Sequence, residues 1–468
     1  MTDPPVRIAV IGSGPAGFYT AGHLLKDSAG SFEVDMLERL PTPWGLVRSG
    51  VAPDHPKIKS VTRVYEKTAA HPRFRFFGNV TFGEHVSRED LLAHYHAIVY
   101  ATGSPSDRPL GIPGEDLPGS HAATEFVGWY NGHPDNTDLE VDLLSAERAL
   151  VIGNGNVALD VARMLVLSPA ELAPTDTADH ALEVLADSHV REVVVVGRRG
   201  PAQAAFTNPE LLELGELSDV DVIVDPDELD RALAVHDSDA GSDITSRRNV
   251  EILRSYAERP PSGRPKRIVL RFLLSPISLI PDGRDHLGAV ELARNELVFA
   301  PGGSLRASPT EERETIASGL VFRAIGYRGI PLPGVPFDER SGTIPNEGGR
   351  ILDPTTGAAL HGEYVVGWIK RGPSGVIGTN KKDAQETVNA IFADASSGGE
   401  DLHAGGRAPQ NPDAAAVEQL LRDRQPELVT YDGWSSIDRH ERALGEQTGR
   451  PRVKLTRIEE MLRIAAGD

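Results

Sequence analysis

The stretch Arg7–Leu25, RIAVIGSGPAGFYTAGHLL, decides the fold. Its apolar residues 8–11 predict a buried strand, and the residues after Gly17 predict a helix. Glycines at 12, 14 and 17 lie between the two, which is the spacing of a dinucleotide-binding turn. Gly12 permits the tight turn, Gly14 lets the backbone approach a pyrophosphate, and Gly17 lets the helix pack on the sheet. The alternative is a glycine turn in an ordinary α/β fold.

An acidic residue follows at the expected distance. The next apolar segment, EVDMLE, ends at Glu38, about 20 residues beyond Gly17. A carboxylate at this position accepts hydrogen bonds from the hydroxyls of a ribose, and the helix N-terminus offers N–H groups to the phosphates. Strand, turn, helix and acid therefore predict one complete nucleotide-binding unit.

A second copy of the pattern occurs at residues 149–166, ALVIGNGNVALDVARMLV. Gly153 and Gly155 repeat the first two glycines, and Ala158 is an accepted substitute for the third. Two copies far apart in one chain predict an α/β protein with two Rossmann-like domains and two dinucleotides.

The second copy differs from the first at the end of its next strand. The segment VVVVGRRGP, residues 193–201, places Arg198 and Arg199 where the first unit has Glu38. Paired arginines bind a 2′-phosphate that an acid would repel. At about 1.5–3 kcal/mol per charged hydrogen bond, they predict a ~10²- to 10⁴-fold preference for NADPH over NADH. The alternative is a solvated basic loop tip.

Two matching stretches predict how the domains are nested. AIVYATGSPSDRPLG and GLVFRAIGYRGIPLPG each join an apolar strand to a proline-rich connection, a pattern typical of flavoproteins with two dinucleotides. We therefore expect a flavin domain made of residues 1–106 and 322–468, with a nicotinamide domain, 107–321, inserted in it. Residues 395–412 have the composition of a linker, and the segment after them is expected to be helical.

Composition excludes several classes of protein. The 468 residues are 40% hydrophobic and contain no cysteine, which excludes a disulfide, a cysteine-ligated cluster and a redox-active cysteine pair. The formal net charge of −20 argues against a nucleic-acid partner. No apolar run is long enough for a membrane span, and the N-terminal residues do not resemble a signal peptide, so we expect a cytoplasmic protein.

Six segments together resemble the adrenodoxin-reductase family of ferredoxin–NADP⁺ reductases, and the resemblance covers nearly the whole chain. They are IGSGPAGFYTA, TPWGLVRSGVAPDHPKIK, RFRFFGNVTFGEHV, VIGNGNVALDVAR, VGRRGPAQAAFT and GEYVVGWIKRGPSGVIGTNKKDAQETV. The resemblance implies the glutathione-reductase-like architecture and an FAD-dependent enzyme that takes hydride from NADPH. Single electrons would then pass to a small iron–sulfur protein of the ferredoxin or adrenodoxin type.

The resemblance also assigns residues to each cofactor. Those implied for FAD, besides the first glycine turn, are Ala16, Glu38, Leu46, Phe82, Trp368, Gly375, Val376 and Ile377. Phe82 departs from the valine that is usual in the family. Those implied for NADPH are Arg108, Gly153, Asn154, Gly155, Asn156, Val157, Arg198, Arg199, Glu210 and again Gly375.

Two further roles rest on the same resemblance. His55 and Glu213 would relay protons through water during flavin reduction, with structural hydrogen bonding as the alternative. Arg247, Arg248 and Arg254 would form a docking surface for the acidic iron–sulfur partner, with a solvated charged face as the alternative.

Other functions remain open at the level of sequence. An FAD-dependent monooxygenase and a diaphorase that reduces a small molecule would use the same two motifs, and a non-enzymatic NADPH sensor would bind nucleotide without reducing a flavin. The absence of cysteine excludes the thioredoxin-reductase and glutathione-reductase mechanisms, because neither can work without a redox-active pair. A monomer with an external electron acceptor is expected.

Overall fold

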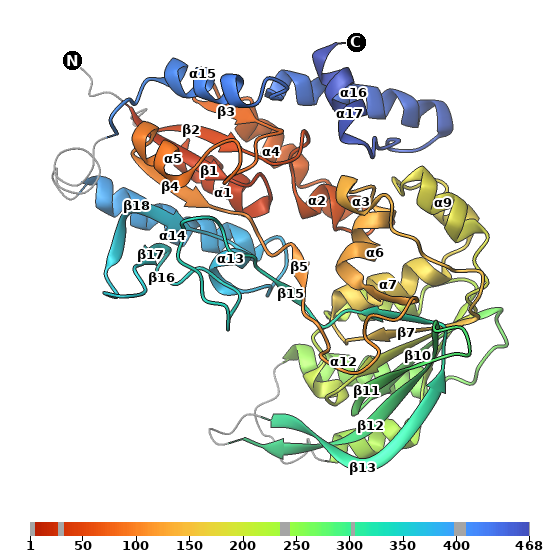
Figure 1. Cartoon of the computed structure of the whole chain (residues 1–468). Coiled ribbons are helices and arrows are strands. Elements are labelled where there is room, and N and C mark those ends of the chain that lie inside the picture. Colours follow the sequence, from red (N-terminus) through yellow and green to blue (C-terminus); the bar gives the residue numbers. More distant parts are fainter. Residues whose placement is uncertain (1–4, 27–31, 235–243, 301–304, 397–408, 468) are drawn as a thin grey trace. The chain divides into compact units, whose positions relative to one another are not determined.

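The computed structural model describes residues 5–26, 32–234, 244–300, 305–396 and 409–467. Within these ranges the chain forms two units (Figure 1). The first unit contains residues 1–106, 131–134 and 327–468, and the second contains residues 107–130 and 135–326. The chain therefore passes out of the first unit and returns to it.

A seven-stranded sheet forms the centre of the first unit, in the order β16-β17-β18-β4-β1-β2-β3. Strands β3, β2, β1, β4 and β18 are parallel, whereas β16 and β17 run antiparallel to their neighbours. The strands are β1 (Val6–Ile11), β2 (Phe32–Leu37), β3 (Phe74–Phe77), β4 (Ala97–Tyr100), β16 (Asn346–Glu347), β17 (Arg350–Leu352) and β18 (Ala359–Val365).

Helices cover both faces of this sheet because alternate residues of each strand point to opposite sides. Ile8 and Val10 pack in the cluster that includes α1 and α14, whereas Ala9 and Ile11 pack in the cluster that includes α5 and α15. The helices of this unit are α1 (Pro15–Leu24), α2 (Leu46–Ser49), α3 (Pro56–Lys59), α4 (Thr62–Ala69), α5 (Arg88–His94), α13 (Trp368–Arg371), α14 (Thr379–Ser396), α15 (Ala414–Arg424), α16 (Tyr431–Thr448) and α17 (Ile458–Ala466).

The second unit is built on a six-stranded parallel sheet, in the order β6-β14-β7-β8-β10-β9. Its strands are β6 (Ser120–Ala122), β7 (Arg148–Ile152), β8 (Glu192–Gly197), β9 (Val220–Val224), β10 (Lys266–Phe272) and β14 (Leu320–Arg323). Val193 and Val195 of β8 pack against helices, and Val194 and Val196 pack on the other face. Every residue of β8 is buried, as expected for a central strand of a parallel sheet.

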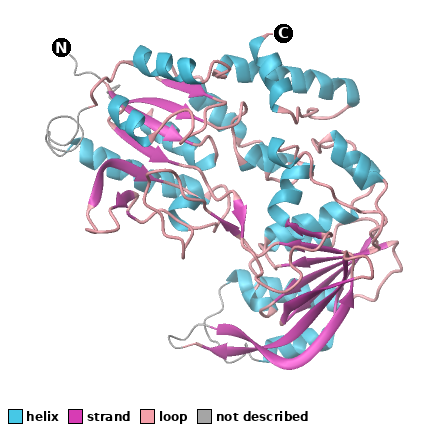
Figure 2. Ribbon diagram, viewed as in Figure 1, coloured by secondary structure: helices cyan, strands magenta, loops and turns pink. Residues whose placement is uncertain are grey.

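An antiparallel sheet of three long strands covers that other face, through Leu279 and Leu292 among other residues (Figure 2). It consists of β11 (Leu274–Pro281), β12 (Leu287–Phe299) and β13 (Leu305–Ala317). The helices of this unit are α6 (Ala123–Tyr130), α7 (Asn156–Val166), α8 (Pro169–Leu172), α9 (Asp179–Ala186), α10 (Asn208–Leu214), α11 (Pro226–Ala234) and α12 (Ile244–Ala257), with a 3₁₀ turn η2 (Pro201–Gln203).

Both nucleotide-type motifs fold as the sequence predicts. β1, α1 and β2 form one strand–turn–helix–strand unit and β7, α7 and β8 form another, which agrees with two Rossmann-like domains. The domain boundary expected from the sequence, residue 322, falls inside β14. Phe322 of this strand pairs with Val151 of β7, and the second unit extends to residue 326. Most of the expected linker, 397–408, lies outside the described residues.

Candidate functional site

The first glycine turn packs closely against its neighbours in the first unit. Gly12 has a φ of +105°, and a Cβ atom there would lie 2.6 Å from the carbonyl oxygen of Ala101. A Cβ on Gly17 would lie 2.2 Å from the carbonyl oxygen of Gly12. A Cβ on Gly14, by contrast, would meet nothing within 4 Å. The backbone at Gly14 is therefore open for a ligand, directly before the N-terminus of α1.

Glu38 lies beside this turn, one residue beyond β2. Its Oε2 accepts hydrogen bonds from the backbone N–H of Ser13 (2.9 Å) and from the Ser13 hydroxyl (2.6 Å). Its Oε1 accepts one from the N–H of Leu40 (3.2 Å). These contacts hold a half-buried carboxylate next to the glycine turn, where a ribose-binding acid is needed.

Three other segments of the first unit adjoin the same turn. The N–H of Trp44 donates to the carbonyl of Ser13 (3.0 Å), and a Cβ on Gly45 would lie 2.9 Å from Cα of Gly14. Thr102 lies against Gly12, because a Cβ on that glycine would be 3.2 Å from Cα of Thr102. Gly367 precedes Trp368, and a Cβ added to this glycine would lie 2.6 Å from Cβ of Ala16.

Each of these segments carries a buried polar atom that has no hydrogen-bond partner among the described residues. The atoms are Nε1 of Trp44, Oγ1 of Thr102 and Nε1 of Trp368. Buried donors are rarely left unpaired, so each needs an explanation. A polar ligand bound at the turn would be the missing hydrogen-bond partner of these atoms, and they fit the flavin nucleotide that the motifs predict. Sequence reasoning missed Trp44 and Thr102, because neither belongs to a glycine motif.

The remaining residues expected at FAD lie in the same unit. Leu46 begins α2 and is partly exposed. Phe82 packs edge-on against Tyr100 of β4, with ring centroids 5.7 Å apart. Gly375 and Val376 are exposed in the turn before α14, where the N–H of Val376 donates to Oγ1 of Thr379 (3.2 Å). Ile377 packs partly against the core.

The second glycine turn is built in the same way. Gly153 has a φ of +142°, and a Cβ there would lie 2.2 Å from the carbonyl oxygen of Ala324. The carbonyl of Asn154 accepts hydrogen bonds from the N–H groups of Ala205 (2.9 Å) and Phe206 (3.2 Å). Nδ2 of Asn154 is buried and has no hydrogen-bond partner in the described part of the chain. The turn therefore presents a buried amide at the carboxyl edge of the sheet.

Residues 155–157 continue from this turn into the helix. Gly155 precedes α7, and Asn156 and Val157 form its first turn. Oδ1 of Asn156 accepts a hydrogen bond from the N–H of Thr207 (2.8 Å), so the side chain fixes the 204–207 segment to the helix N-terminus. This N-terminus faces the same sheet edge at which β8 ends.

Arg198 and Arg199 follow the last residue of β8. Arg198 is exposed and Arg199 is half-buried. Burial lowers the pKa of the Arg199 guanidinium, and the positive charge of Arg198 lowers that pKa further. Neither guanidinium forms an ion pair with a carboxylate of the described residues. Two adjacent cations without an acidic partner are suited to binding an anion such as a 2′-phosphate.

Glu210 and Glu213 lie one turn apart on α10 and face a buried arginine. Nη1 of Arg163, on α7, lies 3.7 Å from Oε2 of Glu210 and 3.8 Å from Oε2 of Glu213. Nη2 of Arg163 is paired with Asp160 at 2.7 Å. Both glutamates are thus held by α7 inside the second unit. His55, the expected relay partner of Glu213, lies at the N-cap position of α3 in the first unit, and the relay stays a prediction.

Arg108 and the three arginines of α12 are exposed in the second unit. The N–H of Arg108 donates to the carbonyl of Gly326 (3.1 Å), just beyond β14. Arg247, Arg248 and Arg254 lie on the exposed side of α12, opposite its buried residues Asn249, Ile252, Leu253 and Tyr256. Arg248 is paired with Glu251 at 2.7 Å.

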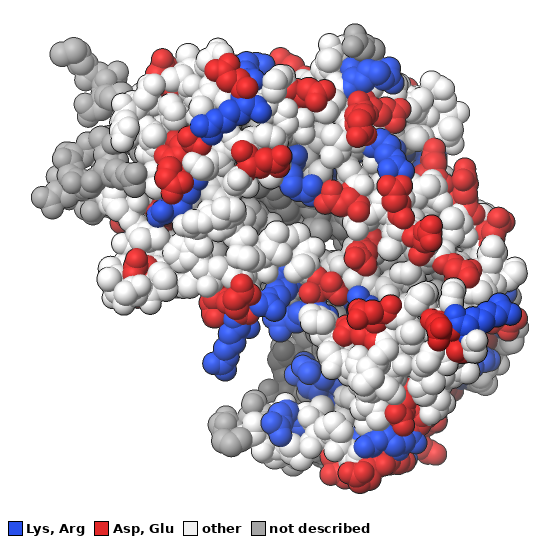
Figure 3. All heavy atoms as spheres, in the orientation of Figure 1, with Lys and Arg blue, Asp and Glu red and all other residues white. Residues whose placement is uncertain are grey.

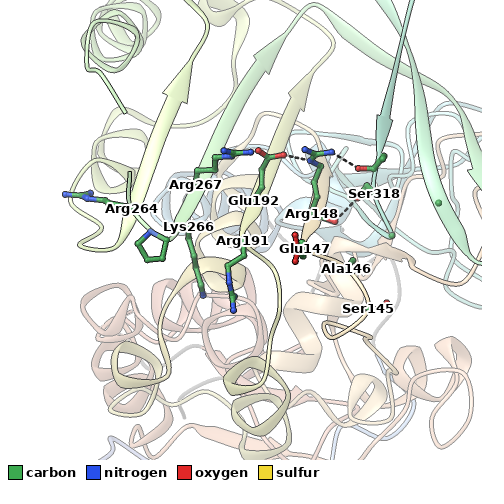
Figure 4. A pocket seen from close by; sticks show the side chains of 14 residues that line it. Ser145, Ala146, Glu147, Arg148, Arg191, Glu192, Arg264, Lys266, Arg267 and Ser318 are labelled. Atoms are coloured by element: carbon green, nitrogen blue, oxygen red, sulfur yellow. Dashed lines mark hydrogen bonds and ion pairs between the residues drawn. The ribbon is translucent and has the colours of Figure 1, made fainter. Parts of the chain in front are cut away.

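A hollow of about 520 Å³ opens at the other edge of the six-stranded sheet (Figure 4). It lies at the amino ends of β7, β8 and β10, whereas the glycine turn and Arg198 lie at the carboxyl ends. Glu192 at its centre is paired with Arg148 and Arg267. Because nucleotides bind at the carboxyl ends of such strands, this hollow does not belong to the candidate site.

Among the described residues, no helix is both long enough and apolar enough to cross a bilayer.

The profile of the pyridine nucleotide-disulphide oxidoreductase family matches residues 6–199. The NADPH-ferredoxin reductase FprA of Mycobacterium tuberculosis is 54% identical over 470 residues, covering 99% of this chain and all of the relative. The mitochondrial NADPH:adrenodoxin oxidoreductase of Arabidopsis thaliana is 40% identical over 99% of this chain and 96% of its own. A structure of Mycobacterium tuberculosis FprA in complex with NADPH matches with a TM-score of 0.91 and 52% identity, over 99% of this chain and 100% of that one.

Proposed function

The chain belongs to the family of NADPH-ferredoxin and NADPH:adrenodoxin reductases, and from this premise we propose that it is an FAD-dependent NADPH–ferredoxin oxidoreductase. Hydride passes from NADPH to FAD, and single electrons then pass to a small iron–sulfur protein. The resemblance predicted from the sequence motifs is confirmed by the identity to both relatives along nearly the whole chain.

One observation carries the flavin assignment. Three segments with unpaired buried donors, at Trp44, Thr102 and Trp368, adjoin a glycine turn beside a held carboxylate, Glu38. Bound FAD supplies the chemistry, since it accepts a hydride and releases electrons one at a time. The residues that we propose to hold it are Gly12, Gly14, Ala16, Gly17, Glu38, Leu46, Phe82, Trp368, Gly375, Val376 and Ile377.

The second unit is proposed to hold NADPH. The glycine turn supplies backbone N–H groups for the pyrophosphate, and Arg198 and Arg199 supply charge for the 2′-phosphate. The full set is Arg108, Gly153, Asn154, Gly155, Asn156, Val157, Arg198, Arg199, Glu210 and Gly375. On this proposal the first unit is the FAD domain and the second is the NADP domain.

The electrons leave the protein because the chain has no cysteine to receive them. The partner is an iron–sulfur protein, and we propose that its acidic surface docks on the exposed arginines of α12, Arg247, Arg248 and Arg254. Figure 3 shows acidic side chains over much of the face that it presents, in line with the formal net charge of −20. A local basic surface is therefore needed to attract an acidic partner.

Three smaller parts of the proposal follow from the same assignment. His55 and Glu213 relay protons during flavin reduction. The protein is proposed to act as a monomer. It works in the cytoplasm and does not bind nucleic acid.

The function is tested on the purified protein. The bound cofactor is released by heat and identified, and the holoenzyme is mixed with NADPH without oxygen. We expect one FAD per chain. The visible absorbance of the flavin should be lost when NADPH is mixed in. Cytochrome c reduction should depend strongly on added ferredoxin. Equal rates with and without ferredoxin would instead favour a diaphorase.

A further inference from the structure

The C-terminal helices of the first unit lie against a loop that adjoins the first glycine turn. We define residues 42–50, which comprise a turn and the short helix α2, as the flavin loop. The ring of Trp44 in the loop meets the ring of Trp434 on α16 edge to face, with centroids 4.9 Å apart. The guanidinium of Arg48 lies over the same Trp434 ring, 5.4 Å from its centroid, which is within the distance of a cation–π contact. Trp434 is 1% exposed, so this contact is fully buried.

A buried carboxylate makes the same connection through charge. Glu441 of α16 is 0% exposed. Its Oε2 accepts from Nη1 of Arg48 (2.9 Å) and from Nη1 of Arg452 (3.0 Å). Its Oε1 accepts from Nη2 of Arg48 and from the N–H of Leu455 (2.9 Å). Both oxygens are therefore used, and the Arg48 fork is bidentate, which fixes its orientation as well as its position.

A lysine beyond α16 completes the attachment. Nζ of Lys454 donates to the backbone carbonyl of Arg48 (3.1 Å) and to Oδ1 of Asn131 (3.1 Å). Lys454 is 5% exposed. The C-terminal segment thus binds both the side chain and the backbone of Arg48.

On its other side, the flavin loop contacts the nucleotide turn in a strained conformation. Trp44 has a φ of +86°, which is rare for a bulky residue and persists only where surrounding contacts hold it. Its N–H bonds to Ser13, and Gly45 packs against Gly14. Its buried Nε1 has no hydrogen-bond partner among the described residues. The contacts with α16 are the ones that hold the strained residue from outside.

We propose that α16, through Glu441 and Trp434, holds the flavin loop in the conformation that receives FAD. Glu441 is a positioning residue that acts through Arg48, and Trp44 is a further FAD-binding residue that donates through Nε1. The inference rests on the proposed function, because it takes FAD as the ligand of the glycine turn. It gives the C-terminal helices a role that the motifs do not reveal.

The test compares Glu441→Gln with Glu446→Gln, the same change at an exposed position of the same helix. Apoprotein is prepared from each, and FAD affinity is measured by quenching of flavin fluorescence at a temperature where far-UV circular dichroism shows full folding. We expect FAD affinity to fall about 10- to 100-fold in Glu441→Gln and the visible flavin spectrum to shift. Glu446→Gln and NADP⁺ binding should be unchanged.

A second variant keeps the test open if Glu441→Gln does not fold. Trp434→Leu removes the ring beneath Arg48 and beside Trp44 and leaves every charge in place. It should also weaken FAD binding in the folded protein. Wild-type FAD affinity and spectrum in a folded Glu441→Gln or Trp434→Leu protein would overturn the inference. Wild-type protein that binds no FAD would instead overturn the proposed function.

Discussion

Two adjacent arginines are proposed to determine the choice of nicotinamide. Burial and the charge of Arg198 lower the pKa of Arg199, and no carboxylate of the described residues pairs with either guanidinium. Replacing both with alanine should lower the ratio of kcat/KM for NADPH to that for NADH by about 10²- to 10⁴-fold. Arg284→Ala, in the exposed turn between β11 and β12, is the control. An unchanged ratio in the double variant would show that the pair does not bind a 2′-phosphate.

His55 is expected to affect the pH dependence of flavin reduction more than its rate. Hydride transfer needs no strong acid or base, because the cofactors carry the chemistry. The variant His55→Gln should slow reduction less than about 10-fold at neutral pH and flatten the pH profile of the reduction rate. Glu213→Gln should flatten the same profile. The measurement is the rate of absorbance loss between pH 5.5 and 8.5, and an unaltered profile in both would leave the two residues structural.

We expect the carboxylate of Glu441 to make the free energy of unfolding depend on pH in the acidic range. Burial by itself would raise its pKa, but the attraction of Arg48 and Arg452 outweighs burial, so its pKa is lowered. A carboxyl whose pKa is lowered in the folded state stabilises the protein at every pH above its pKa in the unfolded chain, about 4.3. This stabilisation is lost as the pH falls from that value through the lower pKa of the folded state. Urea unfolding should therefore show the wild type losing its advantage over Glu441→Gln below about pH 4. A constant difference from pH 7 to pH 3 would contradict this.

At the scale of elements, α12 is the proposed docking surface. Its three arginines project from a helix whose opposite side is buried in the second unit, so reversing them should not disturb packing. The double variant Arg247→Glu and Arg248→Glu should weaken ferredoxin binding about 10-fold or more at low salt, and the difference should shrink as salt rises. NADPH-dependent flavin reduction should stay at the wild-type rate.

The charge control for docking is Arg284→Glu, which reverses one arginine at another exposed site of the second unit and is matched to the single variant Arg247→Glu. It should leave ferredoxin affinity nearly unchanged, because a distant surface charge is screened by salt. Equal losses in both variants would mean that net charge, and not α12, governs the association.

Local patterns predict the elements that form the two nucleotide turns. Gly12, Gly17 and Gly153 lie where a Cβ would collide with a carbonyl oxygen, and the spacing of the glycines within each motif makes them recognisable in the sequence. The strained Trp44 has no such signal, and the ring that packs against it, Trp434, lies far along the chain. The same holds for the pairing of β12 with β11 and β13, which no motif in the sequence marks.

At the scale of the whole molecule, the sequence predicts two nested units from two fingerprints and two connections. The structure adds that β14 belongs with β7 and that the C-terminal helices pack in the first unit. Glu441 and Arg48 are separated by most of the chain, and such a pair is invisible to periodicity or spacing. Long-range partners of this kind depend on the completed fold, which is why the motifs predict the two glycine turns and not the distant residues that pack around them.

The central claim is that electrons pass from NADPH through FAD to an iron–sulfur protein. Anaerobic stopped-flow mixing of the holoenzyme with NADPH, followed by oxidised ferredoxin, tests it most directly. The account predicts fast loss of flavin absorbance and then reduction of the ferredoxin as the flavin is reoxidised. Fast loss of flavin absorbance with no transfer to ferredoxin or adrenodoxin-type proteins would contradict the account and favour a small-molecule acceptor.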